Sequence, residues 1–434
     1  MFLAKSFNEI CTLLSQGLKY TLIVLIIIKL SGESKKMVRR INLKSANVAR
    51  SSTIRDINRQ IILNHIREKS PISRAEIARI TELQRSTVSL IVEELKNIGL
   101  IKEIDGESSG GRPPQLLSLR TANAIAVGVD LGKKRTIVAT SDLAGRILEH
   151  EEFPTDTDFE KTIERIIGSV KYFVHKKGNS IEGIGISVPA LVDPRTGKVL
   201  LVPHLNWHEP AFTERIKTAT GLPVKIDNDA NAAALAELWF GRPEVTAVRD
   251  FILVLIENGI GTGIVFDGQI YHGKGGIAGE FGHMTIGNDA PIACAAGKYN
   301  CWEAFASERS AVARYMKILK KQNGANKISF TKLVNLALEG DEKAQTALKQ
   351  TAYYIGVGIA NLFQGLSPEV AIVTGTIVRA WSLIADDIKI GAESATCQGY
   401  PVAKFIPSTL GNYPTLMGAF SLILIDKFAS ASTI

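Results

Sequence analysis

The sequence is poor in cysteine, and it has no apolar run of membrane-spanning length. Its 434 residues include only four cysteines: Cys11, Cys294, Cys301 and Cys397. This argues against a disulfide-rich secreted fold and favours a reducing, cytoplasmic setting. The uninterrupted apolar run Leu22–Ile28 is far shorter than the ~20 residues that a transmembrane helix needs. The length predicts several domains, and the composition is that of a globular protein without a membrane partner.

Most of the chain, residues 122–434, carries no excess of positive over negative charge. Residues 122–434 hold 31 Lys/Arg and 32 Asp/Glu, whereas residues 37–121 hold 15 and 9, and residues 1–36 hold 5 and 2. The basic excess therefore precedes residue 122. A basic N-terminal module on a neutral body predicts that this module contacts a polyanion.

Residues 1–36 allow three interpretations. The apolar stretch Tyr20–Leu30 could be a signal anchor, although no small-residue cleavage site follows it, or a short helix that packs on the body or on a partner. We favour a third interpretation, in which Met37 is the true start because a basic arm follows it. The segment is then a non-native or unstructured extension.

The apolar spacing after residue 52 predicts three short helices. Thr53–Glu68 has five isoleucines on one expected buried face: Ile54, Ile57, Ile61, Ile62 and Ile66. Ser73, with Glu76 three residues later, forms a capping box that begins a second helix. The third helix, Gln84–Ile98, is expected to be buried through Val88, Ile91, Val92 and Leu95.

The exposed face at the start of the third helix carries hydrogen-bonding groups that suit base edges in the major groove: Gln84, Arg85, Ser86, Thr87 and Ser89. Two short strands, Leu100–Ile104 and Gln115–Leu119, enclose a glycine- and proline-rich tip. There Arg112 is placed to enter a minor groove, although an ordinary linker with a solvated arginine explains the tip as well. We predict a winged helix-turn-helix that binds operator DNA; a small helical protein-interaction domain is the alternative.

From Ala124 onward, continuous apolar runs predict buried strands: Ile125–Asp130, Thr136–Thr140, Ile147–Phe153, Ile184–Pro189, Val224–Ile226 and Phe251–Ile256. Asp227-Asn228-Asp229 opens an alanine-rich helix. Gly273–His283 (GKGGIAGEFGH) precedes a loop with two cysteines, Cys294–Glu303.

In combination these motifs resemble the ROK family (repressors, open reading frames and kinases of sugars) over about residues 53–425. The resemblance implies an α/β fold, with an N-terminal winged helix-turn-helix typical of the repressor branch. A two-lobed actin-like ATPase (ribonuclease H-like) sugar-kinase body follows it. The expected domains are the extension 1–36, the DNA-binding domain 37–121, and the two lobes 122–245 and 246–434.

The resemblance also implies a sugar site. Asp229 matches the general base of the kinases, a role that is expected to be vestigial here, and a helix cap is its structural alternative. The other residues expected to bind sugar are Asn228, Glu280, His283, Glu303 and, more weakly, Asn206, which a loop-capping role explains equally well.

The elements that would bind ATP depart from the kinase pattern. The first loop keeps Asp130 and Gly132, but Lys133-Lys134-Arg135 replace the second glycine and the threonine. The second loop keeps Gly259 and Gly261, but Glu257 stands where a phosphate would approach, and the third element, Thr374-Gly375-Thr376, has one glycine. ATP is therefore not expected to bind.

The family's zinc site is incomplete in this sequence. His283, Cys294 and Cys301 remain, while Ala296 replaces a cysteine ligand. Three ligands can hold zinc, although structural sites commonly have four, and two buried thiols without metal are the alternative.

The preferred function is a non-catalytic repressor, a homodimer or homotetramer whose operator affinity changes when a small sugar or sugar phosphate binds between the lobes. The late helices Thr351–Leu366 and Leu416–Leu424 are expected to pack between lobes and subunits. Two alternatives remain open. One is an ATP-dependent sugar kinase with a fused DNA-binding domain, and the other is a regulator that docks a transport component.

Overall fold

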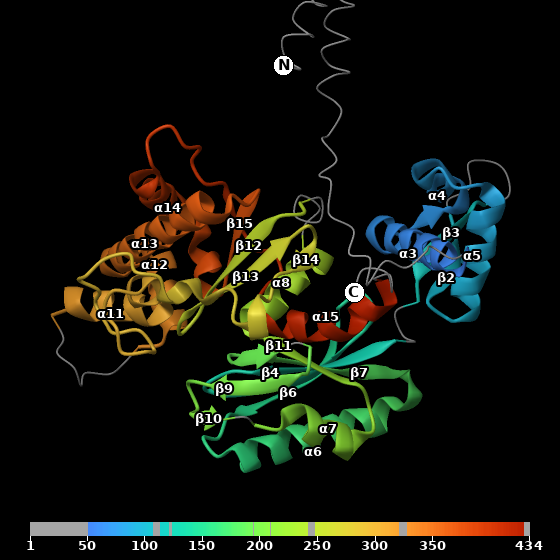
Figure 1. Ribbon diagram of the computed structural model, residues 1–434, viewed down its shortest axis with the longest axis horizontal. Coiled ribbons are helices and arrows are strands. Elements are labelled where there is room, and N and C mark those ends of the chain that lie inside the picture. Colours follow the sequence, from blue (N-terminus) through green and yellow to red (C-terminus); the bar gives the residue numbers. More distant parts are fainter. Residues whose placement is uncertain are drawn as a thin grey trace, which may run out of the picture. The chain divides into compact units, whose positions relative to one another are not determined.

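The computed structural model describes residues 51–106, 113–120, 124–193, 195–208, 210–241, 248–320 and 328–428 (Figure 1). The chain divides into a unit that ends at Ile54 and a larger unit, Arg55–Ile434, which holds nearly everything described below. Within the described ranges, no helix has the length and apolarity needed to cross a bilayer. The predictions for residues 1–36 and for Arg112 lie outside the described residues.

The first module combines three helices with a small antiparallel sheet, as predicted. Its helices are α3 (Ser51–Lys69), α4 (Arg74–Thr81) and α5 (Arg85–Asn97), and its strands are β1 (Ile72–Ser73), β2 (Ile101–Asp105) and β3 (Gln115–Leu119). The sheet order is β1-β3-β2. The Ser73 side chain accepts a hydrogen bond from the Glu76 backbone N–H at 3.1 Å, which confirms the predicted helix start.

The core of this module is narrower than the isoleucine spacing predicts. Ile62, Leu63 and Ile66 are buried on α3, whereas Ile54 and Ile61 are 52% and 39% exposed. The predicted burial of Ile54 and Ile61 was wrong. Ile62, Leu63 and Ile66 occupy the face of α3 that contacts the core, and Ile54 and Ile61 lie outside it. All four predicted core residues of α5 are buried.

The first lobe of the body contains a five-stranded sheet in the order β11-β7-β4-β5-β6. Its strands are β4 (Ile125–Leu131), β5 (Arg135–Ser141), β6 (Ile147–Pro154), β7 (Ile181–Val188) and β11 (Val224–Asn228). The strands β4, β5 and β6 are antiparallel neighbours, and β7 and β11 continue in parallel. Helices α6 (Phe159–Lys177) and α7 (Phe212–Thr220) cover one face. A small sheet of β8 (Leu191–Asp193), β9 (Lys198–Val202) and β10 (Trp207–His208) was not predicted.

The second lobe repeats the same sheet pattern, in the order β14-β13-β12-β15-β16. Its strands are β12 (Phe251–Ile256), β13 (Ile260–Phe266), β14 (Gln269–Ile270), β15 (Val370–Thr374) and β16 (Phe405–Pro407). Its helices are α10 (Trp302–Ala306), α11 (Glu308–Ile318), α12 (Phe330–Leu338), α13 (Glu342–Leu366) and α14 (Trp381–Ala395). Two sheets of one topology confirm the predicted two-lobed body.

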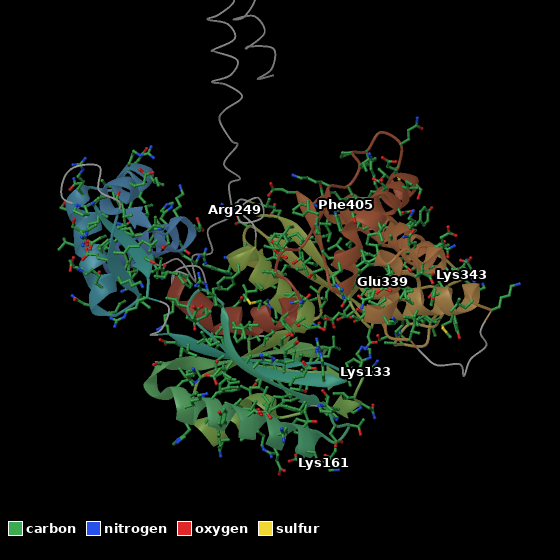
Figure 2. All side chains as sticks on the ribbon, turned by 180° about the vertical axis from the view of Figure 1, so that it is seen from behind. Lys133, Lys161, Arg249, Glu339, Lys343 and Phe405 are labelled. Atoms are coloured by element: carbon green, nitrogen blue, oxygen red, sulfur yellow. The ribbon has the colours of Figure 1, made fainter. Side chains whose placement is uncertain are left out.

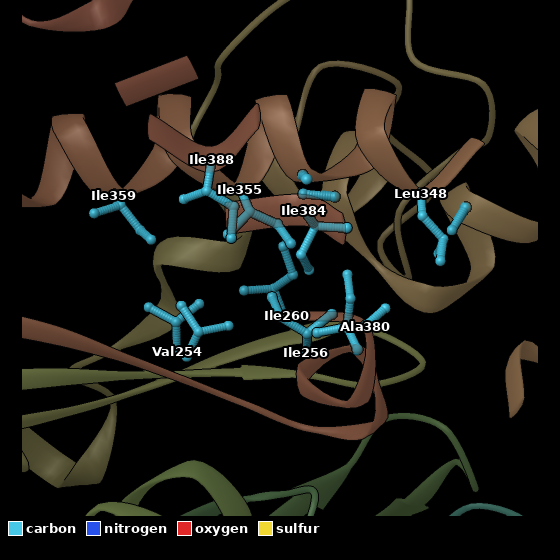
Figure 3. Close-up of a cluster of buried hydrophobic side chains, with 14 of the residues drawn as sticks. Val254, Ile256, Ile260, Leu348, Ile355, Ile359, Ala380, Ile384 and Ile388 are labelled. Atoms are coloured by element: carbon cyan, nitrogen blue, oxygen red, sulfur yellow. The ribbon is translucent and has the colours of Figure 1, made fainter. Parts of the chain in front are cut away.

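The core of the second lobe joins this sheet to α13 and α14 (Figure 3). Val254, Ile256 and Ile260 come from the sheet side, and Ile355 and Ile388 come from the two helices. The region 351–366 lies within α13, which packs against other helices of its own lobe. The expectation that it packs between the lobes was therefore wrong.

Helices α8 (Asp229–Phe240) and α15 (Pro414–Phe428) pack against each other and bridge the two sheets. Helix α15 lies on β4 and β7, on the face opposite α6, and α8 lies against β12 and β13. Glycines permit this close approach. A Cβ at Gly418 would lie 2.3 Å from the backbone carbon of Ala232, so α15 and α8 touch backbone to backbone.

Candidate functional site

The turn between β11 and α8 holds the residues that the sequence singled out first. Asn228 is the N-cap of α8, because its Oδ1 accepts hydrogen bonds from the backbone N–H groups of Ala230 and Asn231 at 2.9 and 3.3 Å. Its amide nitrogen donates to the Ala190 carbonyl at 3.1 Å. Both ends of the Asn228 amide are thus engaged by backbone, and the capping role considered for Asp229 belongs to its neighbour.

Asp229 is the first residue of α8. Burial raises the pKa of Asp229 to about 7, and the negative charges of Asp130 and Glu280 contribute in the same direction. Its Oδ1 accepts a hydrogen bond from the Ala230 N–H at 2.8 Å, which opposes this shift. A half-buried carboxyl that titrates near neutrality can accept hydrogen bonds from a polyol when it is ionised.

A histidine–carboxyl hydrogen bond that the sequence did not reveal ties this turn to the second lobe. His272, in the loop after β14, places Nε2 2.8 Å from Oδ2 of Asp227, whose side chain is only 6% exposed. The other oxygen of Asp227 accepts the Asn228 backbone N–H at 2.8 Å. The lobes are thus joined directly beside Asp229.

Glu303 connects several loops at the start of α10. Its Oε1 accepts hydrogen bonds from the Ala295 backbone N–H at 2.7 Å and from Arg309 Nη2 at 2.8 Å. Arg309, which the sequence did not single out, also donates through Nε to the Asn258 carbonyl at 2.8 Å. Glu303 is buried. Through Oε1, Glu303 connects the cysteine loop to Arg309, which binds the loop after β12. These two hydrogen bonds of Glu303 use Oε1 and not Oε2.

Glu280 and His283 lie in one short 3₁₀ turn, Glu280–His283. Glu280 keeps surface exposure, yet the surrounding protein raises its pKa; the charge of Glu303 raises it further, and His283 opposes the shift. Asp229 also feels the charge of Glu280. The carboxyl groups of Asp229, Glu280 and Glu303 thus lie near enough for Glu280 to raise the pKa of Asp229 and for Glu303 to raise that of Glu280.

His204, in the same loop as Asn206, is influenced by the charges of this part of the site. Burial lowers the pKa of His204, as do the charges of Lys133 and Arg309, while Glu303 raises it. Asn206 is exposed, and its Oδ1 meets the ring of His208 at 3.3 Å. This contact supports the local, loop-stabilising interpretation of Asn206. The sequence carries no signal that separates His204 from any other loop histidine.

The three residues expected to bind metal do come together. The ligand atoms of His283, Cys294 and Cys301 all lie within 4.8 Å of one another, and the two thiols are buried. One imidazole and two thiols form a donor set that suits zinc. Among the described residues this cluster has three members, so the donor set fits zinc with a fourth position open.

The face expected to contact DNA is exposed. Gln84, Arg85, Ser86 and Ser89 are exposed and Thr87 is half-buried, all at the start of α5. Within the described ranges, no ion pair involves Arg85. By contrast, the two acidic residues further along the helix are paired: Glu94 with Arg55 at 2.7 Å, and Glu93 with Arg74 at 2.7 Å. The guanidinium of Arg85 is therefore available to a polyanion.

The comparisons with known proteins agree with this arrangement. The model of the ROK family matches residues 126–425, and a model described as winged helix-turn-helix DNA-binding matches residues 55–102. The chain belongs to the ROK family. It is similar to the xylose repressor of Bacillus subtilis (strain 168), with 31% identity over 394 residues that cover 89% of this chain and 100% of that protein.

Two solved structures share the fold. A ROK family transcriptional regulator, a homolog of the Escherichia coli MLC protein, matches with a TM-score of 0.70 and 28% identity, covering 87% of this chain and 97% of that one. A ROK family glucokinase from Streptomyces griseus, in complex with glucose and AMPPNP, matches with a TM-score of 0.62 and 29% identity. The match covers 69% of this chain and 99% of the glucokinase chain. The match to the regulator includes the N-terminal module. The predicted family and fold are confirmed, and this ROK protein is a DNA-binding transcriptional regulator.

The glycines in and after the segment expected to be the second phosphate loop have packing roles in this ROK protein. A Cβ at Gly261 would lie 2.9 Å from the Ala230 Cβ, and one at Gly263 would lie 2.4 Å from the Ala230 carbonyl oxygen. At Gly259 it would meet Glu303 Oε2 at 2.6 Å. These glycines let α8 and Glu303 approach β13 and its preceding turn, whether or not a phosphate binds.

Carboxyl groups that influence one another's charge come from the segments expected to correspond to the phosphate elements. Burial raises the pKa of Asp130 to about 6 and that of Glu308 to about 7. Glu257 keeps surface exposure, yet the surrounding protein raises its pKa well above the usual value, and the charges of Asp229, Asp130 and Glu308 add to the effect. Thr376, in the third element, donates a hydrogen bond to Glu308.

The hairpin between β4 and β5 is the basic side of this region. Lys133 lies on its tip, as Figure 2 shows, and Lys134 and Arg135 are near enough to lower the pKa of Glu308. All three residues are exposed. Arg135 pairs with Glu152 at 3.3 Å, so its charge is already engaged within this solvent-exposed turn.

Proposed function

We propose that this ROK protein is a sugar-responsive transcriptional repressor whose effector site lies at Asp229, Glu280 and Glu303. One observation carries the proposal: the same chain contains this carboxyl cluster and the helix α5, whose exposed start is expected to read DNA. Carboxylate oxygens accept hydrogen bonds from sugar hydroxyl groups, and Asp229 stands where the lobes meet at the Asp227–His272 pair. Sugar binding there would alter how the lobes close.

We also propose that kinase activity has been lost. Phosphoryl transfer depends on groups that attract and position the phosphates of ATP. Here Glu257, Asp130 and Glu308 gather in the region expected to receive the phosphates. Carboxyl groups supply no positive charge to a polyphosphate and repel it when they are ionised. The basic residues of the β4–β5 hairpin, Lys133, Lys134 and Arg135, offset these carboxyl groups, but they lie exposed at the edge of the region.

The active form is proposed to be a homodimer or homotetramer. A helix-turn-helix protein commonly reads two half-sites one helical turn apart, so two copies of α5 are needed for a palindromic operator. A change in lobe closure would then change the spacing of the two recognition helices, and with it the operator affinity.

The experiment combines a binding assay with a turnover assay. An operator duplex is selected from random DNA with the wild-type protein, and its affinity is measured by fluorescence anisotropy with D-xylose, D-glucose or N-acetylglucosamine. We expect one sugar to change operator affinity and none to be phosphorylated in the presence of MgATP. No sugar effect would contradict the repressor proposal, and sugar-dependent ADP release would contradict the loss of catalysis.

A sugar kinase with a fused DNA-binding domain is the second candidate. The observation that favours it is the pKa of Asp229, which burial raises to about 7. This value suits a general base at neutral pH. The turnover assay separates the two candidates, because only the kinase releases ADP when sugar is added.

Zinc is proposed to occupy the cluster of His283, Cys294 and Cys301, where it would hold the cysteine loop against Glu303. We expect about one zinc per chain in purified protein, and less than ~0.1 equivalent with a lower Tm in Cys294→Ser, because a structural metal contributes to folding. Elemental analysis and thermal unfolding measure both. Cys397→Ser is the matched control, since Cys397 is exposed and outside the cluster. Wild-type protein without zinc would contradict the proposal.

A further inference from the structure

A largely buried arginine of the DNA-binding module lies against two neighbouring aromatic rings of the sugar-kinase-like body. Arg67 belongs to the last turn of α3, and its Cζ lies 4.8 Å from the ring centroid of Trp239 and 4.9 Å from that of Phe428. The side chain is 10% exposed. Burial lowers the pKa of Arg67, while its ion pair with Glu68 at 3.1 Å opposes the shift. Cation–π contact is therefore the main interaction that the body offers this charge.

The contact is reinforced one turn earlier on α3. Asn64 Nδ2 donates a hydrogen bond to the Phe428 carbonyl at 2.9 Å. In the described structure Arg67 Nη1 and Trp239 Nε1 are buried without a hydrogen-bond partner. A guanidinium held by ring faces, with few hydrogen bonds to fix it, can be released by a small displacement of either ring.

Trp239 lies at the opposite end of α8 from Asp229. The helix is anchored along its length by close contacts, with Ala230 against Gly263 of β13 and Ala232 against Gly418 of α15. A close-packed helix transmits a shift of one end to the other rather than absorbing it. Movement at the Asp229 turn thus reaches the ring that covers Arg67.

We propose that Arg67 is the positioning residue through which the body controls the DNA-binding module. The α8 helix connects the effector site to Trp239, and Trp239 with Phe428 holds Arg67. This inference rests on the proposed function, because it requires that a sugar binds near Asp229. It adds the residue contact by which that binding changes operator affinity.

The test compares Arg67→Met with wild type and with Arg59→Met. Arg59 lies on the same helix and pairs with Asp56 of its own helix at 3.2 Å, so it is a matched control. Operator affinity is measured with and without the sugar of the panel (D-xylose, D-glucose or N-acetylglucosamine) that affects the wild type. The wild-type ratio should lie in the range of about 5- to 150-fold that is typical of allosteric coupling. In Arg67→Met we expect the ratio to fall close to one, with an unchanged calorimetric Kd for the sugar.

Two further measurements separate coupling from mere support of the fold. Sugar should change the emission of Trp239, which is obtained as the difference between the spectra of wild type and Trp239→Phe, because Trp207, Trp302 and Trp381 also emit. Arg67→Lys, which keeps the cation, should restore part of the ratio even if Arg67→Met folds poorly. A wild-type ratio of operator affinities with and without sugar in a folded Arg67→Met would overturn the inference about Arg67 but not the proposed function. Trp239 emission that does not change with sugar would have the same consequence. A wild-type protein that responds to no sugar would overturn the proposed function as well.

Discussion

The Asp229→Asn variant is expected to bind its operator normally but to lose control by sugar. An amide has one acceptor oxygen and presents N–H donors where the carboxylate presents two acceptors. Since a hydrogen bond to a charged group contributes about 1.5–3 kcal/mol, the sugar Kd should rise by about 10- to 100-fold. Calorimetry with the active sugar measures this change, and anisotropy measures operator binding.

The pH dependence gives the same prediction a second readout. Because the pKa of Asp229 is raised to about 7, the wild-type carboxyl becomes protonated as the pH falls from 8 to 6. Sugar affinity should fall over that range, and Asp229→Asn should be insensitive to it. Asp158→Asn is the control, since Asp158 caps α6 and asparagine caps equally well. If Asp229→Asn bound the sugar as tightly as the wild type does, Asp229 would not belong to the effector site.

Arg85→Ala should weaken operator binding by about 10- to 100-fold, because one bidentate arginine contact to a base contributes about 1–3 kcal/mol. The fold should persist, since Arg85 is exposed at the start of α5. Anisotropy titrations at fixed salt measure the effect, and circular dichroism checks the fold.

Arg79→Ala is the matched control for this experiment. Arg79 is exposed on α4 and forms an ion pair with Glu76 of the same helix. Arg112→Ala tests the wing tip in the same assay and is also expected to weaken binding. Normal operator affinity in both Arg85→Ala and Arg112→Ala would show that the DNA contacts are assigned to the wrong residues.

Local patterns predicted most of the elements. The α5 core of Val88, Ile91, Val92 and Leu95 follows from helical spacing alone, and the start of α4 follows from the Ser73 cap. Strands buried on both faces, such as β12, read as uninterrupted apolar runs. These features depend on neighbours in the sequence, so the sequence suffices to find them.

The residues that were missed depend on distant partners. His272 meets Asp227 from 45 positions away, and Arg67 meets Phe428 from the far end of the chain. A histidine in a loop or an arginine in the last turn of a helix has many ordinary roles, so neither pattern indicates its contact. The exposure of Ile54 and Ile61 was missed for a related reason, because helical spacing does not show how wide a face the rest of the module covers.

The packing of Gly261 and Gly263 against Ala230 has a consequence for how enzymes are recognised among related sequences. The glycines would be required in any chain that keeps α8 this close to β13, including chains that never meet a nucleotide. A glycine-rich signature after this strand is thus a poor diagnostic of phosphoryl transfer. The side chain at the position of Glu257 discriminates better, because a carboxyl group there supplies no positive charge to a phosphate and repels it when ionised.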